Sequence, residues 1–249
     1  MNKTKQILLF LVLHILSINC IAQIHTMKWN PGIITKEQKK YLDSCEAYKY
    51  DTLGNITNGS TRTMWLDGNY FEYIEIDSAK RKVSWKFRKS TDIEKEERKK
   101  LVLDKTNIHS LIGTQFPELV FVDIDGNTYN STQFNNKVVY MNFWFVGCQP
   151  CELERTKLNQ LYEKYQDNED VIFLSFSNSS EMRTRVHLGK KKLFWPVAIL
   201  NKELKKNLSF VKGYPTNVIL NNQKYEVALA GLAEGTFLVI DEKLELLTQ

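Results

Sequence analysis

Two cysteines separated by two residues could carry redox chemistry in this chain. Cys148 and Cys151 directly follow the apolar run 138–145, which is rich in aromatic and β-branched residues and is typical of a buried central strand. A helical pattern of apolar residues begins at the pair, so Cys148 is predicted at a helix N-terminus. Free backbone N–H groups and the helix dipole stabilise an anion there. Because the thiolate is the attacking species in thiol–disulfide exchange, this placement predicts a reactive sulfur with a lowered pKa.

The spacing of the pair also predicts a division of labour. Cys151 lies three residues along, on nearly the same helix face, and can reach back to the first sulfur. We expect Cys148 to be exposed and to attack, and Cys151 to be shielded and to resolve the mixed disulfide. Pro150 suits the first helical turn because it has no N–H and a fixed φ.

Structural uses of the four cysteines are less favoured. A zinc site needs four ligands, but there is no second Cys-x-x-Cys and no His-x-x-x-His, and the histidines are scattered singly along the chain. A disulfide-stapled scaffold would show more cysteines, evenly paired. Cys45 has no evident partner and is interpreted as a small buried hydrophobe.

The N-terminus has the pattern of a secretory signal. Lys3 and Lys5 precede the apolar stretch 7–18, which is too short for a comfortable membrane span. We therefore predict a signal peptide over residues 1–22 and an exported protein. Loss of this segment would lower the formal charge from +5 to +3, because it carries two lysines and no acidic residue. That charge is too small to indicate a nucleic-acid partner.

Two kinds of processing fit the end of that segment. Ala22 could precede a cleavage site, or Cys20 could be lipidated. Asn19 is larger than the residue that lipoprotein signals prefer before the cysteine, which favours cleavage. Contact with the membrane is expected only if Cys20 is lipidated or the signal is retained.

The rest of the sequence divides into two parts, 23–110 and 111–249. The first is predicted to be a small β-rich region with flanking helices and no recognisable chemistry. Its expected strands include 71–76 and 83–87, one helix is expected to open at Thr35, and Thr91 with Glu94 is expected to cap a second, short charged helix. The second alternates strands and helices, which predicts an α/β fold with a mixed sheet covered on both faces. Its expected strands are 119–124, 138–145, 171–176, 196–200, 216–220 and 225–230, and its expected helices run from the cysteines to 165, over 183–188 and over 237–247.

The segment around the cysteines resembles a known family. Residues 139–151, with the sequence VYMNFWFVGCQPC, resemble the active-site segment of TlpA/ResA-type exported thioredoxin-like proteins. Further family motifs lie on either side: Ile112-Gly113, Pro117, Asp125-Gly126, Glu154, Leu158 and Gly213-Tyr214-Pro215-Thr216. The resemblance covers about residues 111–247, the usual size of one domain.

The resemblance implies a thioredoxin-like fold and a thiol–disulfide oxidoreductase. It favours a reductase of disulfides in exported proteins, working in the periplasm or cell envelope of a bacterium. Electrons would arrive from a membrane thiol transporter, and no cofactor would be needed beyond the redox-active Cys148–Cys151 disulfide. The catalytic residues implied are Cys148, Cys151, Pro215 and Glu154, and the substrate-binding residues are Tyr214, Trp144, Gly147, Gln149 and Pro150.

Some of these roles remain open from the residues alone. Pro215 would form a cis bond that holds the backbone of Tyr214 opposite Cys148, or it is a trans proline that opens an edge strand. Trp144 would pack beneath the active site or serve as an ordinary core tryptophan. Glu154 is a candidate proton acceptor or a solvated helix carboxylate.

The chain departs from the family pattern at other positions. Gly147 stands where the family commonly has tryptophan, which predicts a flatter or more open contact surface. Asn142 occupies the buried position where cytoplasmic thioredoxins carry an aspartate, and an amide cannot transfer a proton. Thr156 replaces the family's usual proline, so the helix is expected to be straighter or differently bent.

Three other functions compete with the oxidoreductase. A peroxiredoxin-like peroxidase would need threonine where the chain has Phe145. A binding or assembly module could use the β-rich region, but it would not need both thiols. Metal delivery would need wider cysteine spacing and a nearby histidine, and only His187 is available in the second part of the chain.

Overall fold

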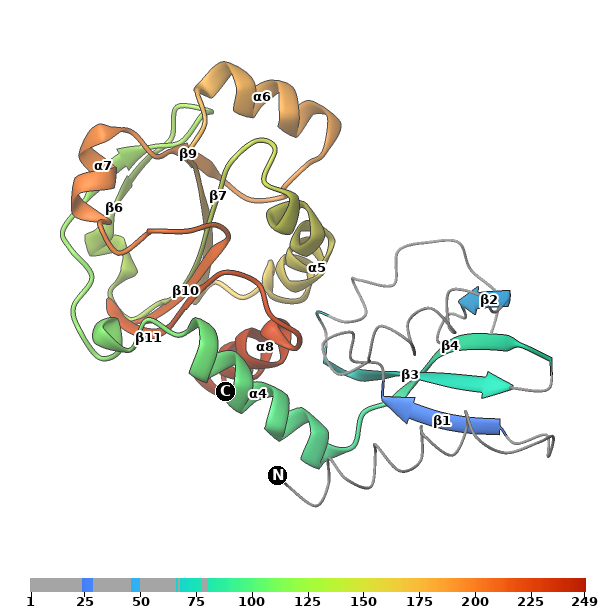
Figure 1. The fold of residues 1–249 in the computed structure, drawn as a ribbon. Coiled ribbons are helices and arrows are strands. Elements are labelled where there is room, and N and C mark those ends of the chain that lie inside the picture. Colours follow the sequence, from blue (N-terminus) through green and yellow to red (C-terminus); the bar gives the residue numbers. More distant parts are fainter. Residues whose placement is uncertain (1–23, 29–45, 50–65, 67, 78–79) are drawn as a thin grey trace. The chain divides into compact units, whose positions relative to one another are not determined.

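The computed structural model describes residues 24–28, 46–49, 66, 68–77 and 80–249 (Figure 1). The chain divides into two compact units, Met1–Thr61 with Tyr70–Lys89, and Arg62–Asn69 with Ser90–Gln249. The predicted signal peptide, both of its alternative processing sites, the predicted helix from Thr35 and Cys45 lie outside the described residues.

The first unit contains a four-stranded sheet of order β1-β3-β4-β2. The strand β3 pairs antiparallel with both β1 and β4, and β2 pairs parallel with β4. The predicted strands 71–76 and 83–87 are confirmed, and both are slightly longer than expected. The strands are β1 Ile24–Lys28, β2 Glu46–Lys49, β3 Tyr70–Asp77 and β4 Lys82–Lys89.

The second unit is built on the predicted mixed sheet. Its five strands have the order β11-β10-β7-β8-β9. The strands β7, β8 and β9 are parallel to one another, while β10 runs antiparallel to both β7 and β11. The central strand β7 is buried at every position, as its apolar run predicts. The strands are β7 Val138–Trp144, β8 Val171–Ser177, β9 Val197–Ile199, β10 Thr216–Asn221 and β11 Lys224–Ala230.

Helices cover both faces of this sheet, and the alternation of side chains in β7 divides the core between them (Figure 1). Tyr140 packs with α4, α5 and α8 on one face, whereas Met141 packs with α7 and the β5–β6 hairpin on the other. The helix α6 lies between β8 and β9 in the chain. The elements are α4 Asp92–Thr106, β5 Val120–Val122, β6 Thr128–Asn130, α5 Gln149–Tyr165, α6 Glu181–Lys190, α7 Lys202–Asn207 and α8 Thr236–Leu247.

The helix α4 belongs with the second unit, although the sequence placed it in the β-rich part. Thr91 and Glu94 form the predicted capping box at its start. The helix packs against α8 and β11. Its buried Arg98 donates hydrogen bonds to the Gly68 carbonyl and to Glu234, so the compact unit starts well before residue 111.

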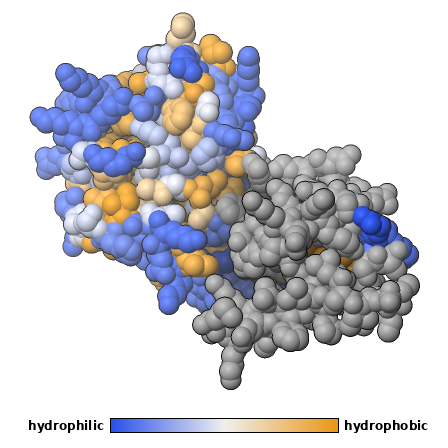
Figure 2. Space-filling view, viewed as in Figure 1, coloured by the Kyte–Doolittle hydropathy of each residue, from blue (hydrophilic) through white to orange (hydrophobic). Residues whose placement is uncertain are grey.

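The surface of the second unit is mixed in character. Hydrophobic residues reach the surface over α6 among hydrophilic ones (Figure 2), where Met182 is 74% exposed and Val186 60% exposed. Within the ranges described above, no helix combines the length and the apolar character needed to cross a bilayer.

Candidate functional site

The junction of β7 and α5 positions the cysteine pair. The strand ends at Trp144, and the chain turns through Gly147, whose φ of +97° is a backbone conformation that favours glycine. Cys148 is the N-cap of α5, and its sulfur accepts a hydrogen bond from the Cys151 amide at 3.3 Å. Pro150 lies in the first turn, as predicted. The pair is thus held at the positive end of a 17-residue helix dipole.

Cys148 and Cys151 are joined in a disulfide, with their Cα atoms 5.3 Å apart. The prediction that Cys148 is exposed is wrong for this state, because Cys148 is 2% exposed and Cys151 is 6% exposed. Both sulfurs belong to a small apolar cluster with Trp144 and Val197. The sequence alone does not show that this cluster buries the sulfurs, because Val197 comes from a strand almost fifty residues further along the chain.

The segment before β10 packs on the same cluster. The Tyr214–Pro215 bond is cis, so the trans alternative is wrong. Pro215 is buried, and Tyr214 packs against the cysteine cluster with its ring 5.4 Å from that of Phe145. Partial burial raises the pKa of the Tyr214 hydroxyl. The structure therefore brings Tyr214, which precedes the buried cis-proline, onto the cysteine cluster from a distant part of the sequence.

The other predicted contact residues surround the pair in different ways. Trp144 packs directly against the cysteines and is 4% exposed, so it lies at the site and is also a core residue. Gly147 and Gln149 are exposed on either side of Cys148, and Pro150 is half-buried. The backbone that flanks Cys148 is thus at the surface although its sulfur is covered.

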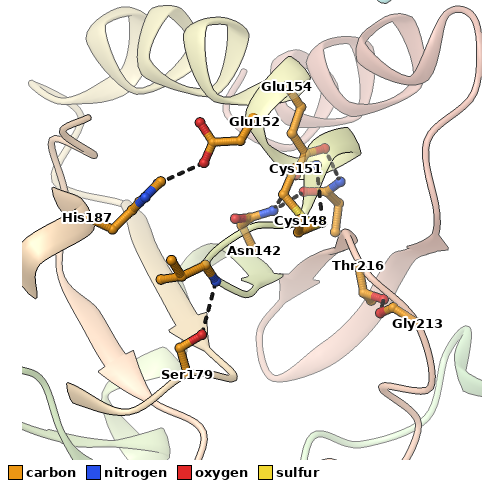
Figure 3. The surroundings of a disulfide bond; sticks show 11 residues. Asn142, Cys148, Cys151, Glu152, Glu154, Ser179, His187, Gly213 and Thr216 are labelled. Carbon is orange, nitrogen blue, oxygen red and sulfur yellow. Dashed lines mark hydrogen bonds and ion pairs between the residues drawn. A yellow bond between two sulfur atoms is a disulfide. The ribbon is translucent and has the colours of Figure 1, made fainter. Parts of the chain in front are cut away.

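Glu154 is fully buried beneath the pair, so the alternative of a solvated helix carboxylate is wrong. Asn142 donates a hydrogen bond to its Oε1 at 2.8 Å, and Asn217 donates one to its Oε2 at 3.0 Å (Figure 3). Burial raises the pKa of Glu154 to about 8, although these two hydrogen bonds act in the opposite direction. Cys151 lies one helical turn before Glu154, so the carboxyl neighbours the pair.

Strand pairing completes this buried polar network. Asn142 in β7 and Asn217 in β10 stand directly opposite each other in the ladder, and the Asn142 amide donates to Asn217 Oδ1 at 2.9 Å. The Tyr140 hydroxyl donates to the same oxygen. Burial, and then the charge of Glu154, raise the pKa of Tyr140 well above its ordinary value. Sequence reasoning missed Asn217, whose only signal is a polar side chain within the apolar run of a buried strand.

A charged cluster lies on the other side of the pair, around Glu152. Its Oε2 accepts hydrogen bonds from Arg155 at 3.0 Å and from Lys191 at 2.8 Å, and its Oε1 lies 2.7 Å from His187 Nε2 (Figure 3). Burial alone would raise the pKa of Glu152. The Lys191 hydrogen bond and the neighbouring positive charges outweigh burial and lower it.

His187 reaches this cluster from α6, and its ring lies 5.5 Å from that of Trp144. The sequence left its position relative to the cysteines undetermined. In the structure, His187 lies close to Cys151, and both residues line the same small cavity.

The fold and the site together define the class of protein. A disulfide at the start of a helix, with a cis-proline packed nearby and a mixed five-stranded sheet behind it, is the arrangement of thioredoxin-like redox proteins. A family model described as Redoxin matches residues 111–246, more than half of the chain. The chain therefore belongs to the Redoxin family.

Comparison with known proteins confirms the resemblance seen in the motifs. Thiol-disulfide oxidoreductase ResA of Bacillus thuringiensis subsp. konkukian (strain 97-27) is 32% identical over 88 residues, which make up 35% of this chain and 51% of the relative. ResA of Geobacillus thermodenitrificans (strain NG80-2) is 26% identical over 121 residues, 48% of this chain and 70% of the relative. The chain thus spans about half the length of the first relative.

A solved structure supports the fold. The crystal structure of a putative thiol:disulfide interchange protein DsbE from Chlorobium tepidum is 20% identical in sequence, with a TM-score of 0.51. The match covers 55% of this chain and 98% of the other. It extends over nearly the whole of that protein, as expected for a shared thioredoxin-like domain.

Proposed function

We propose that this protein is a thiol–disulfide oxidoreductase whose working group is the Cys148–Cys151 pair. The observation that carries the proposal is the disulfide at the N-terminus of α5, where the helix dipole favours a thiolate once the bond is reduced. The ResA relatives are named thiol-disulfide oxidoreductases, which supports the same activity. The pair itself is the redox group, so we propose no further cofactor.

The direction of transfer is proposed to be reduction. Cys148 attacks a disulfide in an exported protein, and Cys151 then attacks Cys148 in the mixed disulfide and releases the reduced substrate. The oxidised pair is reduced again by a thiol transporter in the membrane. Gly147, Gln149 and Tyr214 are proposed to contact the substrate, because they lie beside Cys148 at the surface or packed on its cluster.

The proposed location is outside the cytoplasm, in the periplasm or cell envelope of a bacterium. The support is the charged and apolar pattern of residues 1–22. The proposal is tested by producing the protein in a bacterium, reducing its disulfide in whole cells with a phosphine that does not cross the inner membrane, and then adding a thiol reagent that does not cross it either. Labelling of Cys148 in whole cells is expected, and labelling only after lysis would contradict export.

The activity is tested by the reduction potential of the purified protein in glutathione and dithiothreitol buffers, with Cys148→Ser as the control. A reversible couple near about −250 mV or below is expected for a reductase, whereas about −120 mV would indicate an oxidant. Absence of a reversible couple would refute the oxidoreductase and favour a binding module. Cys151→Ser should trap substrates as mixed disulfides on Cys148, and Cys148→Ser should trap none.

A further inference from the structure

A small cavity lies behind Cys151, on the side away from Glu154. Its volume is about 10 Å³, room for one water molecule, and Trp144, Cys151, Arg155 and His187 are among the residues that line it. The rest of its wall includes leucine side chains. Polar groups therefore lie next to the Cys151 sulfur, and most of the surface around them is apolar.

Three ring or guanidinium nitrogens at this cavity are buried without a hydrogen-bond partner. They are Trp144 Nε1, Arg155 Nε and His187 Nε2. The contact between His187 Nε2 and Glu152 is an ion pair that lacks the direction of a hydrogen bond. An indole or guanidinium N–H can only donate, so the group that satisfies Trp144 and Arg155 must accept, whereas His187 Nε2 donates or accepts according to its tautomer. A water oxygen fits this need and the volume.

The charge around the cavity favours an anion at Cys151. Arg155 and Lys191 carry two positive charges against the one negative charge of Glu152, so the cluster is net positive even when His187 is neutral. The side chains of Arg155 and Glu152 are 22% and 21% exposed, so this field is less screened than it would be at a fully exposed surface.

We propose that the cavity binds one water molecule that stabilises Cys151 as the leaving thiolate, with Trp144 and His187 as positioning residues. This inference rests on the proposed oxidoreductase function. During reduction, a donor thiolate attacks Cys148 Sγ and forms a new S–S bond with it. The Cys148–Cys151 bond breaks, and its electron pair goes to Cys151 Sγ. The water accepts from Trp144 and Arg155, hydrogen-bonds to His187 Nε2 and donates to this sulfur, which is thiolate until it takes a proton.

The test measures the rate at which dithiothreitol reduces the disulfide in the purified protein. Samples are quenched in acid, alkylated and quantified by mass. Trp144→Phe keeps most of the ring and removes the N–H, and His187→Gln removes the imidazole. Each variant is expected to slow reduction about tenfold, the effect of losing one hydrogen bond to a charged group. The double variant should be little slower than either single one, because both act through one water molecule.

Two controls separate positioning from general damage. His109→Gln makes the same change at an exposed histidine outside the cavity and should leave the rate unchanged. The pKa of the Cys148 thiol, measured in a Cys151→Ser background, should be the same with and without Trp144→Phe, whereas disruption of the helix terminus would shift it. Arg155→Lys keeps the charge but removes Nε–H, so it should also slow reduction. It replaces the other two variants in the test if they fold poorly.

Rates within twofold of wild type in all three cavity variants would overturn the inference, as would equal slowing in His109→Gln. A high-resolution crystal structure should show an ordered water within hydrogen-bond distance of Trp144 Nε1, and an empty cavity would also overturn it. If wild type itself cannot be reduced and reoxidised reversibly, the proposed function fails. If wild type cycles normally and the variants match it, only the water site fails.

Discussion

Replacing Glu154 with glutamine should change how the stability of this protein depends on pH. Glu154 is fully buried, and among the residues that the structure describes its hydrogen-bond donors are two side-chain amides and no cation. Burial raises its pKa from an ordinary value of 4.5 to about 8, so the folded protein holds a neutral carboxyl at neutral pH. Glutamine has nearly the same shape and cannot ionise, so the variant isolates the titration of this one group.

The size and sign of the effect follow from linkage. Below pH 4.5 the carboxyl is protonated in both the folded and the unfolded chain. Between 4.5 and about 8 the unfolded chain has lost the proton that the folded one retains, so the free energy of unfolding falls by about 1.4 kcal/mol per pH unit. From pH 5 to pH 8 the wild-type protein should lose about 3.5 kcal/mol relative to Glu154→Gln.

The assay is urea unfolding of the oxidised protein at pH 5, 6, 7 and 8. Wild type and Glu154→Gln should have similar stability at pH 5, and the variant should be the more stable at pH 8. Glu163→Gln, an exposed change on the same helix, should follow wild type throughout. The reasoning is refuted if Glu154→Gln shows the same slope as wild type. The pH profile of disulfide reduction should also lose an inflection near pH 8 in Glu154→Gln.

Four more perturbations follow from the second unit. Arg98→Met removes the buried hydrogen bonds to Gly68 and Glu234 and should lower the free energy of unfolding by about 2 kcal/mol in urea titrations. Gly235→Ala should cost about 1–3 kcal/mol, because its φ is +82°, and thermal unfolding should show a lower Tm. Gly189→Ala should instead stabilise α6 by about 0.5 kcal/mol, since a Cβ there meets nothing. Tyr214→Ala should raise KM for protein disulfides several-fold, because it removes part of the proposed contact surface, and should change the rate with a small disulfide less.

Much of the fold follows from local patterns in the sequence. The apolar run of β7 has no polar interruption except Asn142, and the apolar residues after the cysteines repeat at helical spacing. Both elements therefore form where they were predicted. The hairpin of β10 and β11 also follows, because Asn222 and Gln223 adopt the positive φ that a tight turn needs. The short β6 and the six-residue α7 were missed, since they contain too few residues to show a period.

The environment of the site depends on contacts that no local pattern encodes. Asn217 reaches Glu154 because the antiparallel register places it opposite Asn142. His187 reaches the shell of Cys151 because α6 follows β8 back towards the start of α5. Register and helix placement are set by the packing of the whole core, so a single sequence shows that such residues exist but not what they meet.

Two carboxylates on α5 show how the site separates its tasks. Glu152 and Glu154 are the same residue type two positions apart, and side chains with this spacing point to different sides of a helix. Glu152 meets Arg155 and Lys191, so its pKa falls and it is a fixed negative charge. Glu154 is fully buried, so its pKa rises to about 8 despite hydrogen bonds from two amides, and it can exchange a proton near neutral pH. Proton exchange at Glu154 and the proposed stabilisation of the Cys151 sulfur can therefore be altered separately, by mutation on either side of one helix.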